Sequence, residues 1–340
     1  MSQDQSPLTV AVTGPTGDIG RAFIRALEGA PQVERVIGMA RRPFDPETEG
    51  WTKTEYMQGD VLDRDSVDIL VKDADAVVHL AFLIVDAGGD DGAVNLQGSR
   101  NVFEAAVSAD AKRLIYTSSV AAYGFHADNP SPLDESVPPR GTQGYPYSAQ
   151  KAQVENLLEE ATATSQIAAY TFRPCIVAGP TALSLIEEIP FVQLGDKIPT
   201  AVKKIVGAVP LLRPVVPDPG VPFQLVHEDD VARALLTATI GKGNPGVYNL
   251  AGDGDVTISD LARALGWYSL PIPEIALDAT IKIVSRLPLM PAKASWLNAI
   301  RVPVLMDCSK AKTQLGWEPE YDALATLADT VNAAREKGLV

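Results

Sequence analysis

The chain has 340 residues, of which 46% are hydrophobic and 21% are charged, and its formal net charge is −14. Such a length and composition are typical of a globular protein with one large domain or two ordinary ones, and they argue against disorder. The acidic balance disfavours nucleic acid as a partner, because phosphate binding needs a basic face.

The sequence also contains features that indicate the cellular compartment of the protein. It contains no run of 18 uninterrupted apolar residues, and its first residues lack the basic and apolar regions of a secretory signal. The two cysteines, Cys175 and Cys308, form no C-x-x-C motif, so we expect reduced thiols. These features predict a cytoplasmic protein without a membrane span.

Up to residue 177, apolar β-branched runs alternate with segments of helical periodicity. The predicted strands are 8–14, 33–40, 55–61, 75–82, 113–119 and 167–177. The predicted helices are 18–30, 64–74, 94–110 and 147–164. Apolar strands separated by helices predict an α/β fold, in which a doubly wound parallel sheet is covered on both faces.

From about residue 180 the pattern changes. The stretches 181–222 and 271–306 are rich in proline and apolar residues and do not alternate cleanly, whereas 223–240 and 246–254 return to strand and helix patterns. We interpret the irregular stretches as parts of a smaller C-terminal lobe. The alternative is that they are dimer surfaces or surface loops.

A glycine-rich turn follows the first strand. In "TGPTGDIG", Gly14 permits a tight turn, Gly17 lets the backbone approach a pyrophosphate, and Gly20 allows close packing of helix on sheet. The N-terminus of the helix that follows supplies N–H groups and a positive dipole. A glycine triplet between a first strand and a first helix predicts dinucleotide binding.

The end of the second strand bears on which dinucleotide is bound. The strand ends "GMARRP", so Ala40 stands where an acidic residue would accept the ribose hydroxyls of NAD. Arg41 and Arg42 follow, and arginine pairs with a 2′-phosphate. NADP(H) is therefore favoured, with NAD(H) as the alternative, in which case both arginines are solvated charges on a loop.

Tyr147 and Lys151 are four residues apart, which places both on one face of the predicted helix. A free phenol has a pKa of about 10, and bringing it near 7 requires roughly 4 kcal/mol of preferential stabilisation of the phenolate. A nearby lysine ammonium in a low-dielectric cleft, together with an oxidised nicotinamide, can supply this. We therefore expect Lys151 to lower the pKa of Tyr147.

Nine short segments follow one another along the chain: "TGPTGDIG" (13–20), "GDV" (59–61), "HLAF" (79–82), "NLQGSRNVFEAA" (95–106), "YTSSVAAYG" (116–124), "YSAQK" (147–151), "FRPCIVAGP" (172–180), "LVHEDDVARAL" (225–235) and "LGWEP" (315–319). With these segments in this order, the sequence resembles the extended short-chain dehydrogenase/reductase family, which includes the NAD-dependent epimerases and dehydratases. The segments extend over nearly the whole chain. The resemblance implies a Rossmann-like domain over 1–180, to which 223–252 partly returns, and a smaller substrate-binding lobe over 181–222 and 253–340.

The family's functional residues carry over to this chain by position. The resemblance implies a catalytic set of Ser119, Tyr147 and Lys151, with Ser118 as the alternative serine. It implies no metal. The implied cofactor-binding residues are Gly14, Thr16, Gly17, Asp18, Ile19, Gly20, Arg41, Arg42, Asp60, Val61, Leu80, Ala81, Phe82, Thr117, Tyr147, Lys151, Pro174, Ile176 and Val177. The histidines His79, His126 and His227, and Tyr145, are interpreted as structural.

Comparison with the family pattern favours a mainly apolar small-molecule substrate. The segment "FRPCIVAGP" lacks the Asn, and "GVPFQL" lacks the Arg, that nucleotide-sugar enzymes use for the diphosphate. Val120 and Ala121 stand where dehydratases carry an acidic pair. We therefore predict an NADP(H)-dependent oxidoreductase acting on a carbonyl or secondary alcohol.

Two other functions remain open, namely a sugar-nucleotide epimerase or dehydratase and a non-catalytic dinucleotide sensor. Loss of Tyr or Lys typifies the sensors, so the intact pair argues against that function. By family analogy, helices 94–110 and 147–164 would form the interface of a homodimer.

Overall fold

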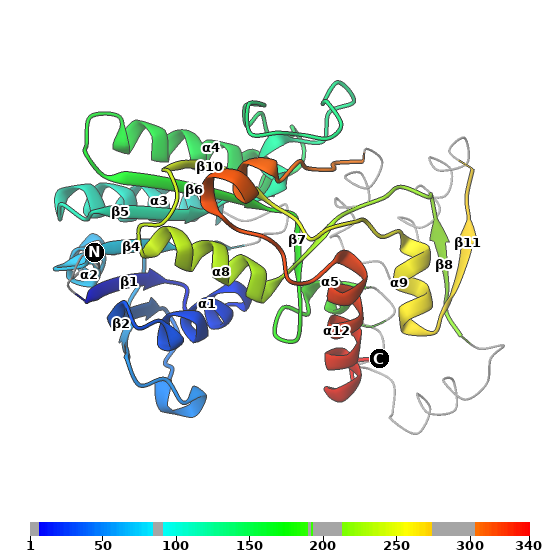
Figure 1. The fold of residues 1–340 in the computed structure, drawn as a ribbon, viewed down its shortest axis with the longest axis horizontal. Coiled ribbons are helices and arrows are strands. Elements are labelled where there is room, and N and C mark those ends of the chain that lie inside the picture. The colour runs from blue at the N-terminus through cyan, green and yellow to red at the C-terminus, as the bar shows by residue number, and fades with distance from the viewer. Residues whose placement is uncertain (1–6, 84–90, 190–191, 193–212, 274–302) are drawn as a thin grey trace.

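Seven parallel strands form the central sheet of this computed structural model, which describes residues 7–83, 91–189, 192, 213–273 and 303–340 (Figure 1). The strand order is β10-β6-β5-β4-β1-β2-β3. The strands are β1 (Leu8–Thr13), β2 (Val33–Ala40), β3 (Thr54–Gln58), β4 (Ala76–His79), β5 (Arg113–Thr117), β6 (Ala168–Pro174) and β10 (Gly246–Leu250). All six pairings are parallel, so the prediction of a doubly wound, Rossmann-like α/β fold is confirmed.

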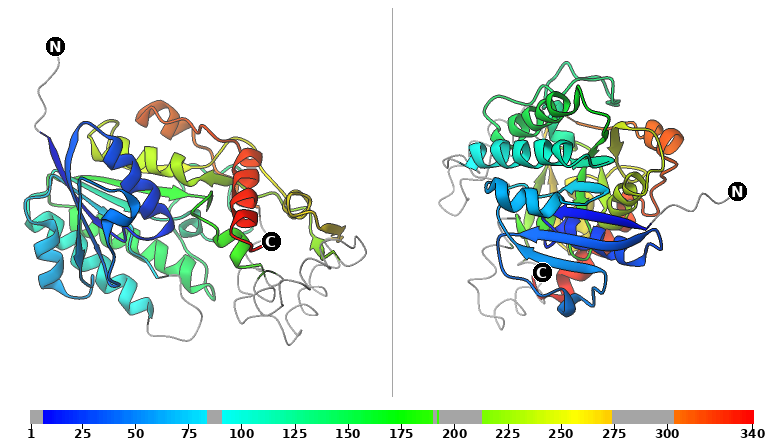
Figure 2. Two further views of the ribbon diagram at one scale, coloured as in Figure 1. Left: turned by 90° about the horizontal axis from the view of Figure 1, so that it is seen from below. Right: turned by 90° about the vertical axis from the view of Figure 1, so that its left-hand side faces the viewer.

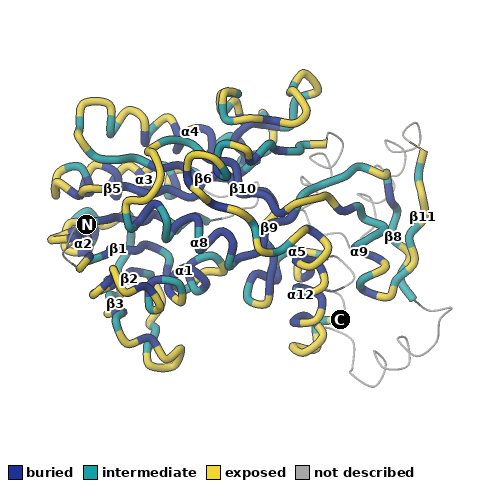
Figure 3. Tube along the Cα trace, in the orientation of Figure 1, coloured by how far each residue is buried: buried dark blue, intermediate teal, exposed yellow. Residues whose placement is uncertain are grey.

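Helices cover both faces of the sheet (Figures 1 and 2). One apolar cluster joins the sheet to α1 (Asp18–Gly29) and α8 (Glu228–Thr239). A second cluster joins the opposite face to α2 (Arg64–Val71), α3 (Asp91–Ser108) and α4 (Pro146–Thr162). The inner strands β1, β4, β5 and β6 are accordingly buried over most of their length, whereas the edge strand β3 is partly exposed (Figure 3). None of the described helices is both long and apolar enough to cross a bilayer.

The period of a strand explains why β1 is apolar throughout. Val10 and Val12 pack in the cluster under α1 and α8, whereas Ala11 packs in the cluster on the other face, and all three side chains are fully buried. Successive side chains of a strand point to opposite faces, so a sheet covered on both sides needs a continuous apolar run rather than an alternating one.

The prediction of one strand over 167–177 is wrong in one respect. The backbone N–H of Cys175 still donates to the Leu250 carbonyl at 2.9 Å, but the chain then leaves the large sheet. The next residues form β7 (Ile176–Ala178), which pairs in parallel with β9 (Leu225–His227) in a separate two-stranded sheet. The carboxyl end of β6 is therefore where the chain passes from the central sheet to the outer segments.

The remaining described elements either lie outside the central sheet or are short helical turns in its connecting loops. Strands β8 (Val215–Asp218) and β11 (Tyr268–Pro271) pair in parallel next to α9 (Ile258–Leu265), which in turn contacts α12 (Ala323–Glu336). The short helical elements are η1 (Pro46–Glu49), η2 (Val120–Tyr123), α5 (Ser184–Glu187) and η4 (Ala311–Leu315). Most of the irregular stretches 181–222 and 271–306 lies outside the described residues, so the division into two lobes stays a prediction.

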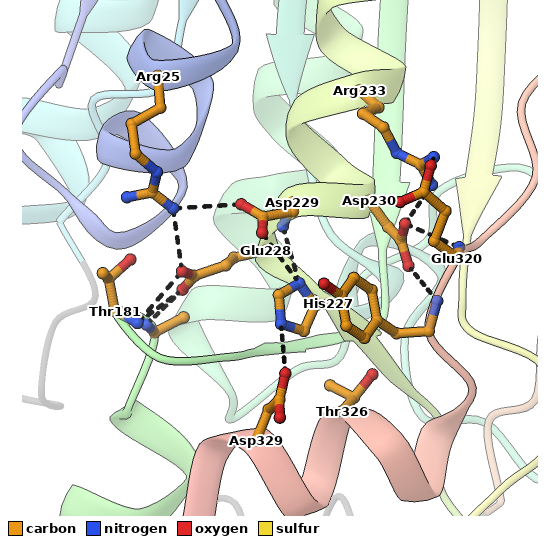
Figure 4. Close-up of polar contacts among 12 residues, drawn as sticks. Arg25, Thr181, His227, Glu228, Asp229, Asp230, Arg233, Glu320, Thr326 and Asp329 are labelled. Atoms are coloured by element: carbon orange, nitrogen blue, oxygen red, sulfur yellow. Dashed lines mark hydrogen bonds and ion pairs between the residues drawn. The ribbon is translucent and has the colours of Figure 1, made fainter. Parts of the chain in front are cut away.

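The segment "HEDD" at the start of α8 holds several distant segments together (Figure 4). The buried carboxylate of Glu228 accepts hydrogen bonds from the backbone N–H groups of Thr181 and Ala182. The fully buried Asp230 accepts from the N–H groups of Glu320 and Tyr321. Buried carboxylates are stable only when bonded in this way, so these contacts fix the chain after β7 and the chain before α12 against α8.

Candidate active site

The turn between β1 and α1 has the shape of a phosphate-binding loop. Gly14 adopts a φ of 74°, and a Cβ on it would lie 2.8 Å from the backbone nitrogen of Ala81. A Cβ on Gly20 would come within 2.1 Å of the Gly14 carbonyl oxygen, so α1 can pack here only without a side chain at position 20. The Cβ position of Gly17 has no neighbour nearer than 3.6 Å, which leaves room for a ligand.

The first turn of α1 adds hydrogen-bond donors to this loop. Gly17 is the N-cap residue, and no side chain caps the helix. Thr16 precedes Gly17, and Asp18 and Ile19 follow it as the first residues of α1. The exposed carboxylate of Asp18 accepts a hydrogen bond from Ser184 Oγ of α5 at 3.1 Å. Uncapped N–H groups and the helix dipole suit an anion. The loop therefore fits the pyrophosphate of a dinucleotide.

Arg41 and Arg42 lie directly after β2, at the same edge of the sheet as Gly14, and both side chains are exposed. Their backbone carbonyls accept hydrogen bonds from the side chains of Gln58 and Tyr56, which fixes the path of the loop. Among the described residues, neither guanidinium has a recorded ion-pair partner. Two exposed cations at this edge suit a phosphate group of a bound dinucleotide.

The other residues expected to border the cofactor lie at the carboxyl ends of β3 and β4. Asp60 and Val61 follow β3, and the Asp60 carboxylate accepts a backbone hydrogen bond within its own turn. Leu80 and Ala81 follow β4, and their N–H groups donate to the carbonyl and the hydroxyl of Thr13. The structure thus brings these segments to one edge, and their contacts with a cofactor stay predictions.

Ser119, Tyr147 and Lys151 meet at this edge of the sheet. Ser119 follows β5 as the N-cap residue of η2, and its hydroxyl accepts a hydrogen bond from the N–H of Ala121 at 3.1 Å. Tyr147 and Lys151 lie one turn apart near the start of α4, where Pro146 occupies the first turn. The Lys151 amine donates to the Thr117 carbonyl at 2.9 Å. Thr117 Oγ1 is buried without a partner among the described residues.

The structure separates the two candidate serines. Ser118 Oγ is buried and donates to Glu155 Oε1 at 2.5 Å. Glu155 in turn forms a buried ion pair with Arg173 of β6, with 2.5 Å between Oε2 and Nη2. Ser118 is thus part of the network that ties α4 to the sheet, whereas Ser119 lies close enough to the Tyr147 phenol to affect its ionisation. Ser119 remains the better candidate.

The expected lowering of the Tyr147 pKa is not found. Burial raises the pKa of Tyr147 above its usual value of 10.0, a hydrogen bond with Ser119 opposes this, and the negative charge of Glu188 adds to it. Burial also lowers the pKa of Lys151 to about 7, against the opposing effect of Glu155. In the protein without cofactor, desolvation is therefore the largest influence on the pKa of both side chains.

Two residues near this site were not identified from the sequence. Glu188 follows α5, and its charge raises the pKa of both Tyr145 and Tyr147. The Tyr116 ring of β5 lies 5.1 Å from the Lys151 amine. Tyr116 stands at the start of the segment "YTSSVAAYG", which was the available signal, whereas nothing in the sequence placed Glu188 near the phenol.

The last predicted cofactor residues lie where β6 gives way to β7. Pro174 ends β6 and is buried, Ile176 begins β7 with 39% of its surface exposed, and Val177 is half-buried. Cys175 between them is buried and free. An apolar side chain therefore faces solvent within the segment "FRPCIVAGP", which contains no asparagine.

The histidines are structural, as expected. His79 is buried, with its ring nitrogens 2.8 Å from Thr13 Oγ1 and 3.0 Å from Ser99 Oγ. His126 donates to the Gly141 carbonyl at 2.7 Å. His227 is buried, accepts from a backbone N–H at the start of α8 and stacks on Tyr321 with 3.9 Å between ring centroids. No group of three or more metal-binding side chains occurs among the described residues.

Comparison with protein families gives one match over most of the chain. Residues 10–251 match the NAD dependent epimerase/dehydratase family. Among curated proteins, the low-salt glycan biosynthesis protein Agl12 of Haloferax volcanii is 27% identical over 335 residues, which cover 92% of this chain and 94% of that protein.

Solved structures of similar fold superpose on this chain over almost the whole length of each protein. The enzyme WbmH of Bordetella bronchiseptica, in complex with NAD+, has a TM-score of 0.70 and 21% identity, with 97% of this chain and 99% of that one covered. UDP-glucose 4-epimerase of Thermotoga maritima, with UDP-glucose, has a TM-score of 0.70 and 22% identity, with the same coverage. At this identity the likeness establishes the fold.

Proposed function

The chain belongs to the NAD dependent epimerase/dehydratase family, and from this we propose that it is an enzyme that epimerises a secondary alcohol carbon of a sugar nucleotide. The observation that carries the proposal is the convergence of Ser119, Tyr147 and Lys151 at the carboxyl edge of the sheet, the edge at which the glycine turn also lies. A bound nicotinamide dinucleotide would supply the hydride acceptor and donor.

Each of the three side chains has a role that follows from its surroundings. Tyr147 exchanges the proton of the substrate oxygen, as a general base in oxidation and a general acid in reduction. The N–H of Ala121 occupies an acceptor site of the Ser119 hydroxyl, and this hydroxyl, which interacts with the Tyr147 phenol in the free protein, would donate to the oxygen of a bound substrate. Lys151 places a positive charge beside the phenol, and its amine would donate to the ribose of a bound cofactor.

The choice of epimerisation rests on the comparisons and on η2. One structural relative is a UDP-glucose 4-epimerase and one sequence relative is named for glycan biosynthesis, which favours a sugar nucleotide over the apolar substrate predicted above. Val120 and Ala121 follow Ser119, and neither has a side chain that can take up or give a proton. Elimination of water by an acidic pair at that place is therefore disfavoured.

Incubation with UDP-glucose and other UDP-hexoses tests the proposal. We expect the isomeric sugar to form without a net change in the absorbance of the reduced nicotinamide, because hydride is taken and returned in one turnover. The products are separated by ion-exchange chromatography and identified by NMR. If no UDP-hexose is converted under conditions in which the protein binds a dinucleotide, the proposed substrate class is wrong.

A second function is favoured by one observation. The side chain of the exposed Ile176, in the segment that lacks the asparagine of the nucleotide-sugar enzymes, offers no hydrogen bond, which suits the apolar carbonyl or alcohol predicted from the sequence. An oxidoreductase of this kind would oxidise NADPH in proportion to the ketone it reduces. A ketone panel run beside the UDP-hexoses distinguishes the two functions.

Arg41 and Arg42 lead us to propose a preference for NADP(H). We expect the protein freed of cofactor to bind NADPH at least about tenfold more tightly than NADH, because a charge-assisted pair with phosphate contributes about 1.5–3 kcal/mol. The double variant R41A/R42A should lose this preference, with NADH affinity changed less than about twofold. Quenching of protein fluorescence measures both affinities.

A matched control for this pair is R35A, since Arg35 lies on the same strand at its other end and pairs with Glu55 on the surface. It should leave both affinities unchanged. Equal loss of NADPH and NADH affinity in R41A/R42A would contradict the assignment, because a 2′-phosphate contact affects only the phosphorylated cofactor.

A further inference from the structure

The Lys151 amine lies among three aromatic rings. It is 3.8 Å from the ring centroid of Phe82, 5.1 Å from that of Tyr116 and 5.8 Å from that of Tyr147. The residue is 4% exposed. Its recorded hydrogen bond among the described residues goes to the Thr117 carbonyl, so the rings surround an amine that has lost most of its water.

The rings come from three different elements. Phe82 follows β4, Tyr116 lies near the carboxyl end of β5, and Tyr147 lies in the first turn of α4. The parallel register that pairs His79 with Tyr116 brings the first two together. Phe82 also meets the Tyr147 ring edge to face, with 5.7 Å between centroids and 89° between planes. Phe82 thus contacts both members of the Tyr–Lys pair.

Aromatic faces can replace part of the lost water. The π face is negative, and a cation over it gains about 0.5–1 kcal/mol at exposed sites and about 2 kcal/mol or more where water is excluded. A buried ammonium is otherwise driven to lose its proton, and burial indeed lowers the pKa of Lys151 to about 7. The ring nearest to the amine is that of Phe82, which is the residue best placed to oppose this loss.

The neighbouring ionisable groups are not sufficient by themselves to keep the Lys151 amine protonated. Glu155, on the same helix, raises the pKa of Lys151, but it is already paired with Arg173 of β6. His79 of β4 is held neutral, with its pKa lowered to about 3 mainly by burial and also by the charge of Lys151. Glu188, after α5, acts on the Tyr147 phenol.

We propose that Phe82 is a positioning residue, whose ring face keeps the Lys151 ammonium charged and in place beside Tyr147. Phe82, Tyr116 and Tyr147 together are called the aromatic cage below. The cage is a property of the free protein. Its effect on turnover rests on the function proposed above.

The test is the titration of Lys151 in the full chain without cofactor. The ε-methylene carbon of lysine is followed by NMR in protein labelled with ¹³C-lysine, and the Lys151 signal is assigned by its absence in K151M. Phe82→Leu removes the π face but keeps an apolar cover of similar size. We expect F82L to shift the Lys151 midpoint down by about 0.5–1.5 pH units.

Two further variants separate the π face from packing. Phe82→Tyr keeps the ring and should leave the midpoint within about 0.3 pH units of wild type. Phe125→Leu removes a ring that contacts Tyr145 and is not one of the three around the amine, so it should not move the midpoint. An unchanged or raised midpoint in folded F82L overturns the proposal, because the ring then acts only as a cover. A shift in F82Y as large as that in F82L overturns it equally.

The consequence for turnover is measured separately. If F82L lowers the Lys151 midpoint, the pH profile of kcat should move in the same direction, whereas kcat at the optimum should fall less than in K151M. A shifted midpoint without any turnover by the wild type would leave the aromatic cage in place and refute the proposed function alone.

Discussion

Replacing Tyr147 with phenylalanine should lower kcat by about 10²–10⁴-fold, which is the range for loss of a general acid–base group. The substitution removes one hydroxyl and keeps the ring that packs against Phe82 and Tyr145. We therefore expect dinucleotide affinity to change less than about threefold. Initial rates with the substrate found in the UDP-hexose or ketone panel, and fluorescence titration of the cofactor, measure the two quantities.

Tyr145→Phe is the matched control. Tyr145 is the neighbouring phenol, its ring centroid is 6.0 Å from that of Tyr147, and its ring is not one of the three around the Lys151 amine. This variant should retain most of the activity. If Y147F keeps the full rate while its fold and cofactor affinity are intact, the proton passes through another group.

Replacing Lys151 with methionine should stabilise the protein at neutral pH while it lowers activity. The pKa of Lys151 falls from 10.5 to about 7 on folding, so burial of the amine costs at most about 5 kcal/mol. The Thr117 carbonyl would lose its donor, which costs about 1–3 kcal/mol. The expected gain in the free energy of unfolding is therefore about 2–4 kcal/mol.

The pH dependence of this gain has a definite sign. Between pH 7 and 10.5 the unfolded wild type binds more protons at Lys151 than the folded protein does, so its stability rises with pH there. The advantage of K151M should be largest below about pH 7 and should shrink as the pH rises towards 10.5. Urea denaturation at several pH values measures it. The exposed Lys242 supplies the control, K242M, for which we expect no such trend.

Much of the fold could be predicted from the sequence because the signals are local. A β-branched run that ends at Gly14, followed by a segment of helical period, specifies β1, the turn and α1 without knowledge of the rest of the chain. The break after Pro174 could not be predicted in this way. The run from Ala168 to Val177 is mostly apolar, and its division depends on which strand lies alongside, since β10 pairs with the first part and β9 with the second.

The candidate site likewise has some features that depend on local sequence and others that depend on the tertiary structure. The spacing of Tyr147 and Lys151 placed both on one helical face, and the structure agrees. Their ionisation could not be read from spacing, because it depends on how much water the surrounding segments exclude. The aromatic cage could not be predicted from the sequence either, because the register of β4 on β5, and not closeness in the sequence, brings Phe82 and Tyr116 together.

The departure of β7 from the central sheet has a consequence for how such a protein can change. Ser119, Tyr147, Lys151 and the glycine turn all belong to the large sheet, its loops and its helices, whereas β7, α5 and the β8–β11 pair lie outside that sheet. We therefore expect substitutions or insertions in these outer segments to leave the Tyr–Lys pair and the glycine turn in place. Relatives of this chain can then differ in their outer segments while they keep the same sheet and the same polar groups at its carboxyl edge.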